Sequence, residues 1–133
     1  MPEITGIAHV ELSVRNLDAS STWYGALFGA KEVFRVTQEK DQLEACAILI
    51  PGPSTVIAFT HHDAVEPTDF TAKRTGLDHL SFAVAYRAAL DGWAIRLNEL
   101  GIPNNGVADY GYARAITFNN PDGIALEFFC RGA

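Results

Sequence analysis

Two histidines and one glutamate have the residue types and the sequence context of a metal site. His9 and His79 each lie in a segment of alternating polar and apolar residues, and Glu127 is the acidic residue of a third, mostly apolar segment. Such alternation is typical of strands with one polar and one apolar face. Two imidazoles and a carboxylate can hold a divalent cation and leave positions for water or substrate. The alternative is that each side chain is a structural polar residue satisfied by hydrogen bonds.

An internal repeat makes the two histidines equivalent. A shift of 70 residues places His9 on His79, and a shift of 68 places Ala45 on Ala113 in two matching A-x-A-I stretches. Each half has roughly 65 residues, which is small for an independent core, so we expect the halves to pack together. A pseudo-twofold axis between them would bring the polar strand faces, and both histidines, into one shared cup.

Each half is predicted to fold as β-α-β-β-β, which makes the chain an α+β protein. In the first half, the expected strands lie at 7–14, 31–38, 43–50 and 55–62. In the second half, they lie at 77–84, 103–109, 113–118 and 124–130. We therefore expect one domain, with a first module at 1–63, a polar linker at 64–75 and a second module at 76–133.

A helix is expected after the first strand of each half. The first carries an apolar stripe of Trp23, Leu27 and Phe28, with Asp18 as the candidate N-cap and an end near Gly29. The second has apolar residues at helical spacing from Leu90 to Leu100 and ends at Gly101.

Composition limits the classes of partner. The chain has 133 residues and a formal net charge of -6, which disfavours nucleic acid and anionic membranes. No apolar run is long enough to span a membrane, and no secretory signal is recognised. Two cysteines without a C-x-x-C motif favour a reducing, cytoplasmic setting. A small-molecule substrate is the expected partner.

Four stretches resemble one known family. G-I-A-H-V-E-L-S-V at 6–14 and G-L-D-H-L-S-F-A-V at 76–84 look like its paired first strands, W-Y-G-A-L-F-G-A-K at 23–31 resembles its first helix end, and N-P-D-G-I-A-L-E-F-F at 120–129 resembles its last hairpin. The family is the vicinal oxygen chelate superfamily, also called the glyoxalase/bleomycin resistance/dioxygenase superfamily. The resemblance implies two paired βαβββ modules around a U-shaped cavity, and a homodimer. It also implies a divalent ion, which could be Zn, Mn, Fe, Ni or Co, on His9, His79 and Glu127.

Three departures separate the chain from well-known branches of that family. The fourth ligand of glyoxalase I would stand at the repeat partner of Glu127, which the 68-residue shift gives as Phe59. Extradiol dioxygenases carry an acid/base tyrosine ten residues before the ligand glutamate, where this chain has Thr117. Fosfomycin-modifying enzymes have a further basic C-terminal segment, whereas only Arg131 follows Glu127 as a cation here.

Glu11 follows His9 by two residues and shares its strand face, so it is the candidate catalytic base or an outer metal ligand. The alternative is a hydrogen bond to a neighbouring strand. Arg114 is either a carboxylate-binding residue or half of a structural ion pair, and His61 is either at the cavity rim or solvated beside His62. The predicted substrate pocket comprises Ser13, Phe59, Ser81, Tyr110, Tyr112, Thr117 and Phe129, with the two tyrosines on a mobile flap.

The sequence thus favours a metal-dependent enzyme that binds vicinal oxygens of a small organic substrate. Its chemistry would be of the isomerase, lyase or transferase type, through an enediolate-like intermediate. Two alternatives stay open: a metal-free, bleomycin-resistance-like ligand-binding protein, and an Fe(II)-dependent extradiol-type dioxygenase.

Overall fold

The chain divides into two compact units, Met1–Pro67 and Thr68–Ala133. The structure is a computed structural model that describes residues 1–38, 40, 43–52 and 55–132. Unit 1 holds His9, which directly precedes its first strand, and unit 2 holds His79 and Glu127. Each unit is described by itself below.

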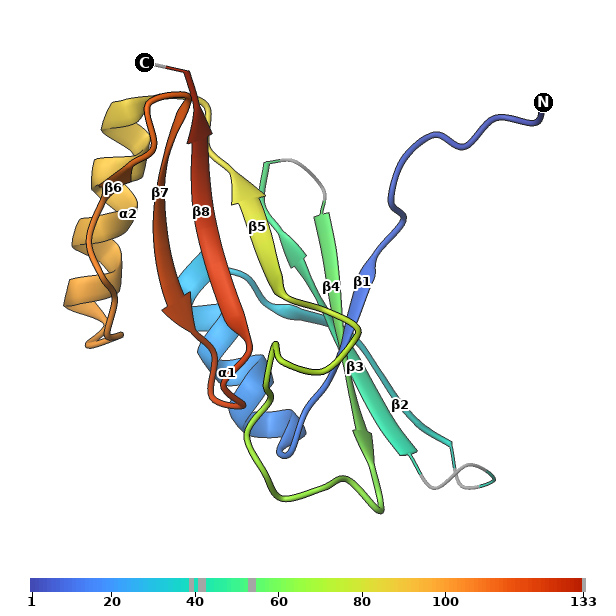
Figure 1. Ribbon diagram of the computed structural model, residues 1–133. Helices are drawn as coiled ribbons and strands as arrows, with labels where there is room; N and C mark the ends of the chain where they lie inside the picture. Colours follow the sequence, from blue (N-terminus) through green and yellow to red (C-terminus); the bar gives the residue numbers. More distant parts are fainter. Residues whose placement is uncertain (39, 41–42, 53–54, 133) are drawn as a thin grey trace. The chain divides into compact units, whose positions relative to one another are not determined.

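Unit 1 is a four-stranded sheet with one helix (Figure 1). The sheet order is β1-β4-β3-β2; β1 runs parallel to β4, and the other neighbours are antiparallel. Its elements are β1 (Val10–Ser13), α1 (Leu17–Phe28), β2 (Glu32–Gln38), β3 (Leu43–Ile50) and β4 (Thr55–His62).

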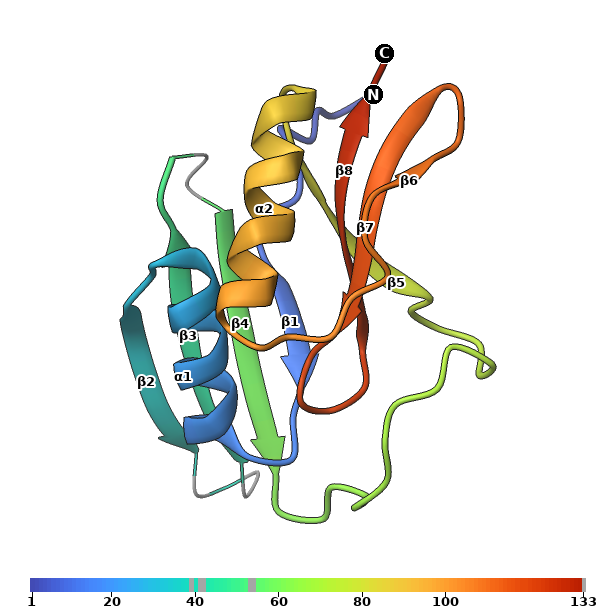
Figure 2. The same cartoon turned by 90° about the vertical axis from the view of Figure 1, so that its left-hand side faces the viewer.

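Unit 2 repeats this arrangement (Figure 2). Its sheet order is β5-β8-β7-β6, again with a parallel first pair. Its elements are β5 (His79–Ala83), α2 (Arg87–Glu99), β6 (Ala108–Asp109), β7 (Ala113–Asn119) and β8 (Ala125–Arg131). The two βαβββ units confirm the predicted α+β class. Among the described residues, no helix is both long and apolar enough to cross a membrane.

Three predicted boundaries need correction. The expected strand at 7–14 shortens to Val10–Ser13, which leaves His9 just before the strand. The N-cap of α1 is Asn16 and not Asp18: the Asn16 backbone is extended, and its Oδ1 accepts a hydrogen bond from the Ala19 N–H at 2.9 Å. Asp18 lies in the first turn instead. The expected strand at 103–109 shortens to the two residues of β6, because only Asn104 in its earlier part bridges β7, as an isolated pair with Phe118.

Each helix covers one face of the sheet in its own unit. The Tyr24 ring of α1 lies 4.7 Å from the Phe59 ring of β4, and the Trp93 ring of α2 stacks on Phe128 of β8 at 4.3 Å. Tyr24, Phe59 and Phe128 are almost wholly buried. Because strand side chains alternate, the neighbours of these residues along each strand point away from the helix. We call that second side of each sheet the distal face.

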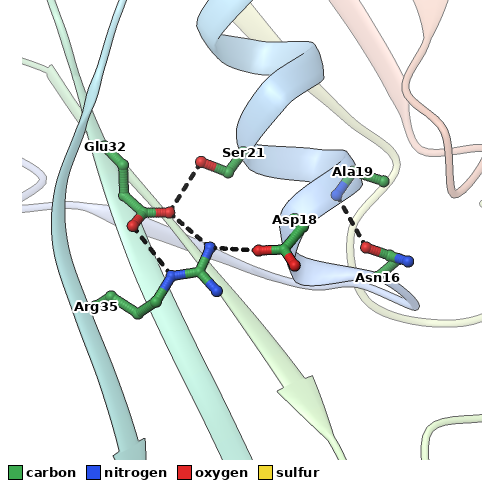
Figure 3. A network of polar contacts seen from close by, with 6 residues as sticks. All are labelled: Asn16, Asp18, Ala19, Ser21, Glu32 and Arg35. Atoms are coloured by element: carbon green, nitrogen blue, oxygen red, sulfur yellow. Dashed lines mark hydrogen bonds and ion pairs between the residues drawn. The ribbon is translucent and has the colours of Figure 1, made fainter.

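A polar network joins α1 to the edge strand β2 (Figure 3). The Arg35 guanidinium contacts Asp18 Oδ1 at 2.8 Å and binds both oxygens of Glu32, whose carboxylate also accepts a hydrogen bond from Ser21 Oγ at 3.0 Å. The bond to Arg35 lowers the pKa of Glu32 from 4.5 to about 2. Burial raises the pKa of the adjoining Cys46 thiol to about 11, which agrees with a packing role for this cysteine.

The lowered pKa of Glu32 predicts how the free energy of unfolding depends on pH. Because folding lowers this pKa, the carboxylate contributes stability above pH 4.5, and the contribution is lost as the pH falls towards 2. Both side chains are partly exposed, so we expect Glu32→Gln to cost only about 0.5–1 kcal/mol of unfolding free energy at pH 7. Urea unfolding of both proteins at pH 7, 4 and 2.5 should show that difference shrink with acidification. The control Glu99→Gln, on α2 of unit 2, should show no such trend.

Candidate functional site

Strand register gathers the polar residues of unit 2 on its distal face. Ser81 of β5 pairs with Glu127 of β8, which in turn pairs with Thr117 of β7. Cross-strand partners share a face, so these three side chains form one polar row. The next cross-strand row holds Phe128, whose ring faces α2, and this fixes the side to which Glu127 points.

Two predicted ligands lie together in this unit. His79 Nε2 is 3.7 Å from Glu127 Oε1, and Ser81 Oγ donates a 2.7 Å hydrogen bond to the same oxygen. On the other side of the ring, His79 Nδ1 is 2.7 Å from Asp78 Oδ1. A proton on Nδ1, donated to Asp78, leaves the lone pair of Nε2 on the side of Glu127. In that tautomer, Asp78 orients the imidazole, and Nε2 is the nitrogen beside Glu127.

The donor atoms fit a small divalent cation. Nitrogen and carboxylate oxygen bind such ions at about 2.1 Å, so two donors on one ion are at most about 4.2 Å apart. The 3.7 Å between His79 Nε2 and Glu127 Oε1 falls inside that limit. Within the described parts of the chain, however, no three His, Cys, Asp or Glu side chains form a cluster that could hold a metal. The structure thus unites two of the three predicted ligands, and the contribution of His9 stays a prediction.

Unit 1 presents a different row on its distal face. Register pairs Glu11 of β1 with Ala58 of β4, Ala58 with Ala47 of β3, and Ala47 with Phe34 of β2. His9, Glu11 and Ser13 are exposed, while Leu12 and Val14 are buried, as the alternation predicted. We name the four paired residues the Glu11–Phe34 row.

The predicted position of Phe59 requires correction. Phe59 pairs with Leu12 and packs against Tyr24 in the core, so it faces α1 and not the distal face. The Glu11–Ala58 pair of unit 1 corresponds to the Ser81–Glu127 pair of unit 2. The counterpart of Glu127 is therefore Ala58, at an offset of 69 instead of 68. An error of one residue in the alignment of the two halves exchanges the two faces of a strand. Alanine cannot bind a metal either, so the fourth-ligand position is still without a donor.

Other predicted residues have simpler environments. Arg114 forms an ion pair with Asp109 at 3.1 Å. Of the two roles expected for this arginine, the structure therefore shows the structural ion pair. His61 Nδ1 lies 3.1 Å from the Val14 carbonyl oxygen, so this ring faces the β1 end instead of bulk water. Phe129 is half-buried on the distal face of unit 2.

The predicted tyrosine flap is a hydrogen-bonded turn between β6 and β7. Tyr110 and Tyr112 are exposed, and their ring centroids are 6.4 Å apart. The Gly111 N–H donates to Asp109 Oδ1 at 2.8 Å, and the Tyr110 N–H donates to the Ala113 carbonyl at 2.9 Å. Its mobility and its contact with substrate stay predictions.

Asp78 is the residue that the sequence reasoning missed. It directly precedes His79, and its carboxylate orients the ring. An acidic residue adjacent to a candidate ligand histidine was the available signal. Unit 1 has Ala8 at the equivalent position, so this orienting carboxylate belongs to only one of the two histidines.

Comparison with known proteins gives the family. The model of the Glyoxalase/Bleomycin resistance protein/Dioxygenase superfamily matches residues 6–128. A solved glyoxylase/bleomycin resistance protein/dioxygenase domain from Frankia sp. EAN1pec is 31% identical, with a TM-score of 0.89 over 98% of this chain and 100% of that chain. FosX from Listeria monocytogenes, complexed with Mn(II) and sulfate ion, is 18% identical, with a TM-score of 0.68 over 98% and 95% of the two chains, which shows the fold alone.

A longer bacterial protein is also similar. "Putative ring-cleaving dioxygenase MhqA" of Bacillus subtilis (strain 168) is 25% identical over 130 residues, which cover 96% of this chain but 40% of that protein. The chain thus spans well under half the length of this relative. The family match, in contrast, includes both βαβββ units and the His79–Glu127 pair. The chain belongs to the glyoxalase/bleomycin resistance protein/dioxygenase superfamily.

Proposed function

We propose that the protein is a divalent-metal-dependent enzyme that acts on vicinal oxygens of a small organic substrate. The observation that carries the proposal is the His79–Glu127 pair, in which Asp78 orients the imidazole and Ser81 holds the carboxylate. Glu127 would be costly to keep partly buried as an anion without a positive partner, and a cation would supply one. The Mn(II) in the FosX structure supports the same choice of cofactor.

His9, His79 and Glu127 would hold the metal. Once bound, a divalent ion supplies Lewis acidity to the two oxygens of the substrate. Glu11 is the proposed base, which takes a proton from the carbon beside a carbonyl group. Its place agrees with that role: Glu11 lies one strand away from Ala58, the counterpart of Glu127, so it is close to a ligand position without occupying it. Adjacent strands are about 4.8 Å apart.

Metal stoichiometry tests the proposal. The purified protein, stripped with a chelator and titrated separately with Mn(II), Zn(II), Fe(II), Ni(II) and Co(II), should bind one equivalent of at least one ion. The variant His9→Ala should bind that ion at least about 100-fold more weakly, because it removes one of three protein ligands. The variant His62→Ala is the control and should bind as the parent does. Binding of no ion by the parent protein would refute the metalloenzyme.

The same metal titration tests Asp78, for which a smaller loss of affinity is expected than for a metal ligand. The variant Asp78→Asn keeps the size of the side chain but removes the charge that stabilises a proton on Nδ1. We expect metal affinity to fall by about 10–100-fold, as is usual for residues that orient a ligand histidine. The matched control Asp91→Asn, also an exposed aspartate of unit 2, should leave the affinity unchanged. Equal affinities for Asp78→Asn and the parent would exclude Asp78 from this role.

A second candidate is ring cleavage with Fe(II) and O2, which the similarity to the Bacillus subtilis protein favours. Thr117 is the residue to examine, because register places it directly opposite Glu127. A threonine hydroxyl at this position has little capacity to exchange protons near neutral pH. Oxygen uptake by Fe(II)-loaded protein with catechol would favour the dioxygenase. The predicted homodimer is part of either proposal, and sedimentation equilibrium would check it.

A further inference from the structure

The chain that leads into β5 first contacts the turn between β7 and β8. The Phe70 N–H donates a 2.8 Å hydrogen bond to the carbonyl oxygen of Asp122, in the middle of that turn. Phe70 is half-buried and is followed by a smaller turn, in which the Lys73 N–H donates to Thr71 Oγ1 at 3.2 Å. We call Asp69 and Phe70 the strap, because they tie the start of unit 2 to its last hairpin.

The turn that the strap contacts is held together by its own hydrogen bonds. Asn120 Oδ1 accepts from the N–H groups of Asp122, at 3.0 Å, and Ile124, at 2.8 Å. The Asn120 N–H donates to the Ile124 carbonyl, and the Gly123 N–H donates to the Asn120 carbonyl, both at 3.0 Å. Asn120 and Asp122 are also buried. Hydrogen-bonded polar groups in a buried place make their surroundings rigid, so the turn is a firm support for the strap.

The strap lies so close to Gly123 that a side chain fits there only if one of the two segments moves. A Cβ atom at position 123 would be 3.2 Å from Asp69 Cβ and 3.4 Å from Asp69 Cγ. The φ angle of Gly123, +81°, disfavours other residues as well. Gly111 separates these two effects, because its φ is +83° but nothing lies within 4 Å of a Cβ at that position. The close contact with Asp69 is therefore specific to Gly123 in this comparison.

The strap and the turn lie at the end of the sheet that carries His79. Register pairs His79, the first residue of β5, with Ala125, the first residue of β8, which begins two positions after Gly123. Glu127 is two residues further along β8, on the face of His79. The ends of secondary structure elements are the parts that open most readily. Of the two predicted ligands in unit 2, His79 is thus the one whose position depends on a strand end.

The separation of the two donor atoms leaves little room for such opening. Two ligands of one small divalent ion are at most about 4.2 Å apart, and His79 Nε2 is 3.7 Å from Glu127 Oε1. A displacement of the start of β5 by about 1 Å would exceed that limit. The His79 side chain is 43% exposed, so its neighbours confine it only in part.

Unit 1 shows what happens at the equivalent strand end without a strap. The chain before His9, residues 1–8, is exposed throughout. The ladder between β1 and β4 begins at Val10, one residue after His9, whereas the ladder between β5 and β8 begins at His79 itself. Because the two histidines are repeat partners, the ladder of unit 2 is closed one position further. The βαβββ architecture therefore forms without a strap, and the strap accompanies a paired histidine.

We propose that the strap is a positioning element for the His79–Glu127 pair. By holding the β7–β8 turn, it keeps the ladder of β5 closed as far as His79 and so keeps the imidazole within reach of an ion on Glu127. The inference rests on the proposed function, which gives the pair its metal. It assigns a role to Asp69 and Phe70, which lie outside the predicted ligand set and pocket, and it makes His79 the pre-positioned member of the two histidines.

Gly123→Ala tests the strap against a matched glycine variant. It pushes the strap away from the turn, whereas Gly111→Ala has the same backbone cost before the opposite end of β7, without the contact. In the metal-free proteins, hydrogen–deuterium exchange of residues 77–82, followed by mass spectrometry, should be about tenfold faster in Gly123→Ala than in the parent and in Gly111→Ala. Titration with Mn(II) and Co(II) should show affinity about 10–100-fold lower in Gly123→Ala and unchanged in Gly111→Ala.

A second pair of variants tests the hydrogen bond of the strap. Phe70→Pro removes both the ring and the N–H that binds Asp122, and Phe70→Ala removes the ring alone. We expect Phe70→Pro to resemble Gly123→Ala in both measurements and Phe70→Ala to have the smaller effect. If Phe70→Pro does not fold, the two glycine variants decide.

A double variant tests whether the strap acts through His79. In a His79→Ala background, Gly123→Ala should cause no further loss of metal affinity, because the side chain that the strap positions is already gone. A general structural defect would instead lower the affinity in both backgrounds by the same factor.

The outcomes separate this inference from the proposed function. Failure of the parent protein to bind any metal refutes the proposed function, and with it a strap that serves a metal-binding pair. If metal binds but Gly123→Ala equals Gly111→Ala in exchange or in affinity, the inference is wrong and the metal site stands. An equal loss of affinity from Gly123→Ala with and without His79 also overturns the inference alone.

Discussion

Replacing Glu127 with alanine is expected to abolish the stabilisation that a divalent metal gives to the folded protein. A ligand that binds only the folded state at a concentration 100 times its Kd adds about 2.7 kcal/mol to the free energy of unfolding. The parent protein should show this gain when it is unfolded by urea with and without the metal. The variant Glu127→Ala should show almost none, because it loses the only anionic member of the proposed ligand set.

The same experiment distinguishes a metal ligand from a purely structural hydrogen-bond acceptor at Glu127. Glu127 is 13% exposed in its side chain, and its oxygen accepts the Ser81 hydroxyl. If Glu127 served only as a structural acceptor, Glu127→Ala would destabilise the metal-free protein by about 1 kcal/mol, and metal would affect parent and variant alike. If it is a ligand as well, the metal-free variant loses the same hydrogen bond, and only the parent gains stability when metal is added.

Ser81→Ala is the matched control for this prediction. It deletes the hydroxyl that donates to Glu127 but leaves both metal donors in place. We expect its metal affinity to fall by about tenfold, as for other residues that support a ligand, so that about half of the metal-dependent stabilisation, about 1.4 kcal/mol, remains at the same metal concentration. Equal loss in Ser81→Ala and Glu127→Ala would contradict the assignment of Glu127 as the ligand.

The strands and their faces were largely predictable from local patterns. The expected strands at 43–50 and 55–62 coincide with β3 and β4. The alternation around His79 placed this histidine on the same face as Ser81 and Glu127, because a period of two needs no information from distant residues. The N-cap was less certain, since Asn16 and Asp18 are both good capping residues and only the backbone geometry distinguishes them.

The counterpart of Glu127 was not predictable in the same way. The A-x-A-I match at a shift of 68 lies two residues out of the structural register of β3 and β7, which preserves the face of the side chains. The loop that follows absorbs one residue, so the same shift exchanged the faces of β4 and placed Phe59 on the wrong side. Asp78 escaped notice for a different reason: its role depends on side-chain direction, which periodicity does not encode.

Replacing Glu11 with glutamine is expected to stop proton transfer without loss of the metal. Hydroxyacetone, which carries a hydroxyl and a carbonyl oxygen on adjacent carbons, provides a direct assay. Its C–H proton next to the carbonyl passes to the carboxylate, the electron pair moves towards the carbonyl oxygen, and solvent deuterium then returns to carbon. Proton NMR in D2O should show metal-dependent exchange by the parent protein and a rate at least about 100-fold lower for Glu11→Gln. Calorimetry should give both proteins the same metal affinity within about threefold.

Substitutions at Glu11 and at Ala58 distinguish a catalytic base from a metal ligand at Glu11. Ala58→Glu places a carboxylate at the structural counterpart of Glu127 while Glu11 stays in place. A base at Glu11 predicts that Ala58→Glu tightens metal binding, by about tenfold for one added anionic ligand, and slows exchange by filling a position that substrate oxygen needs. If Glu11 were itself a ligand, Glu11→Gln would weaken metal binding strongly, and the double variant Glu11→Gln with Ala58→Glu would restore it. Glu44→Gln, on β3 with its side chain on the opposite face, should change neither measurement. The same pair of readings, metal affinity and exchange rate, therefore assigns Glu11 one role and excludes the other.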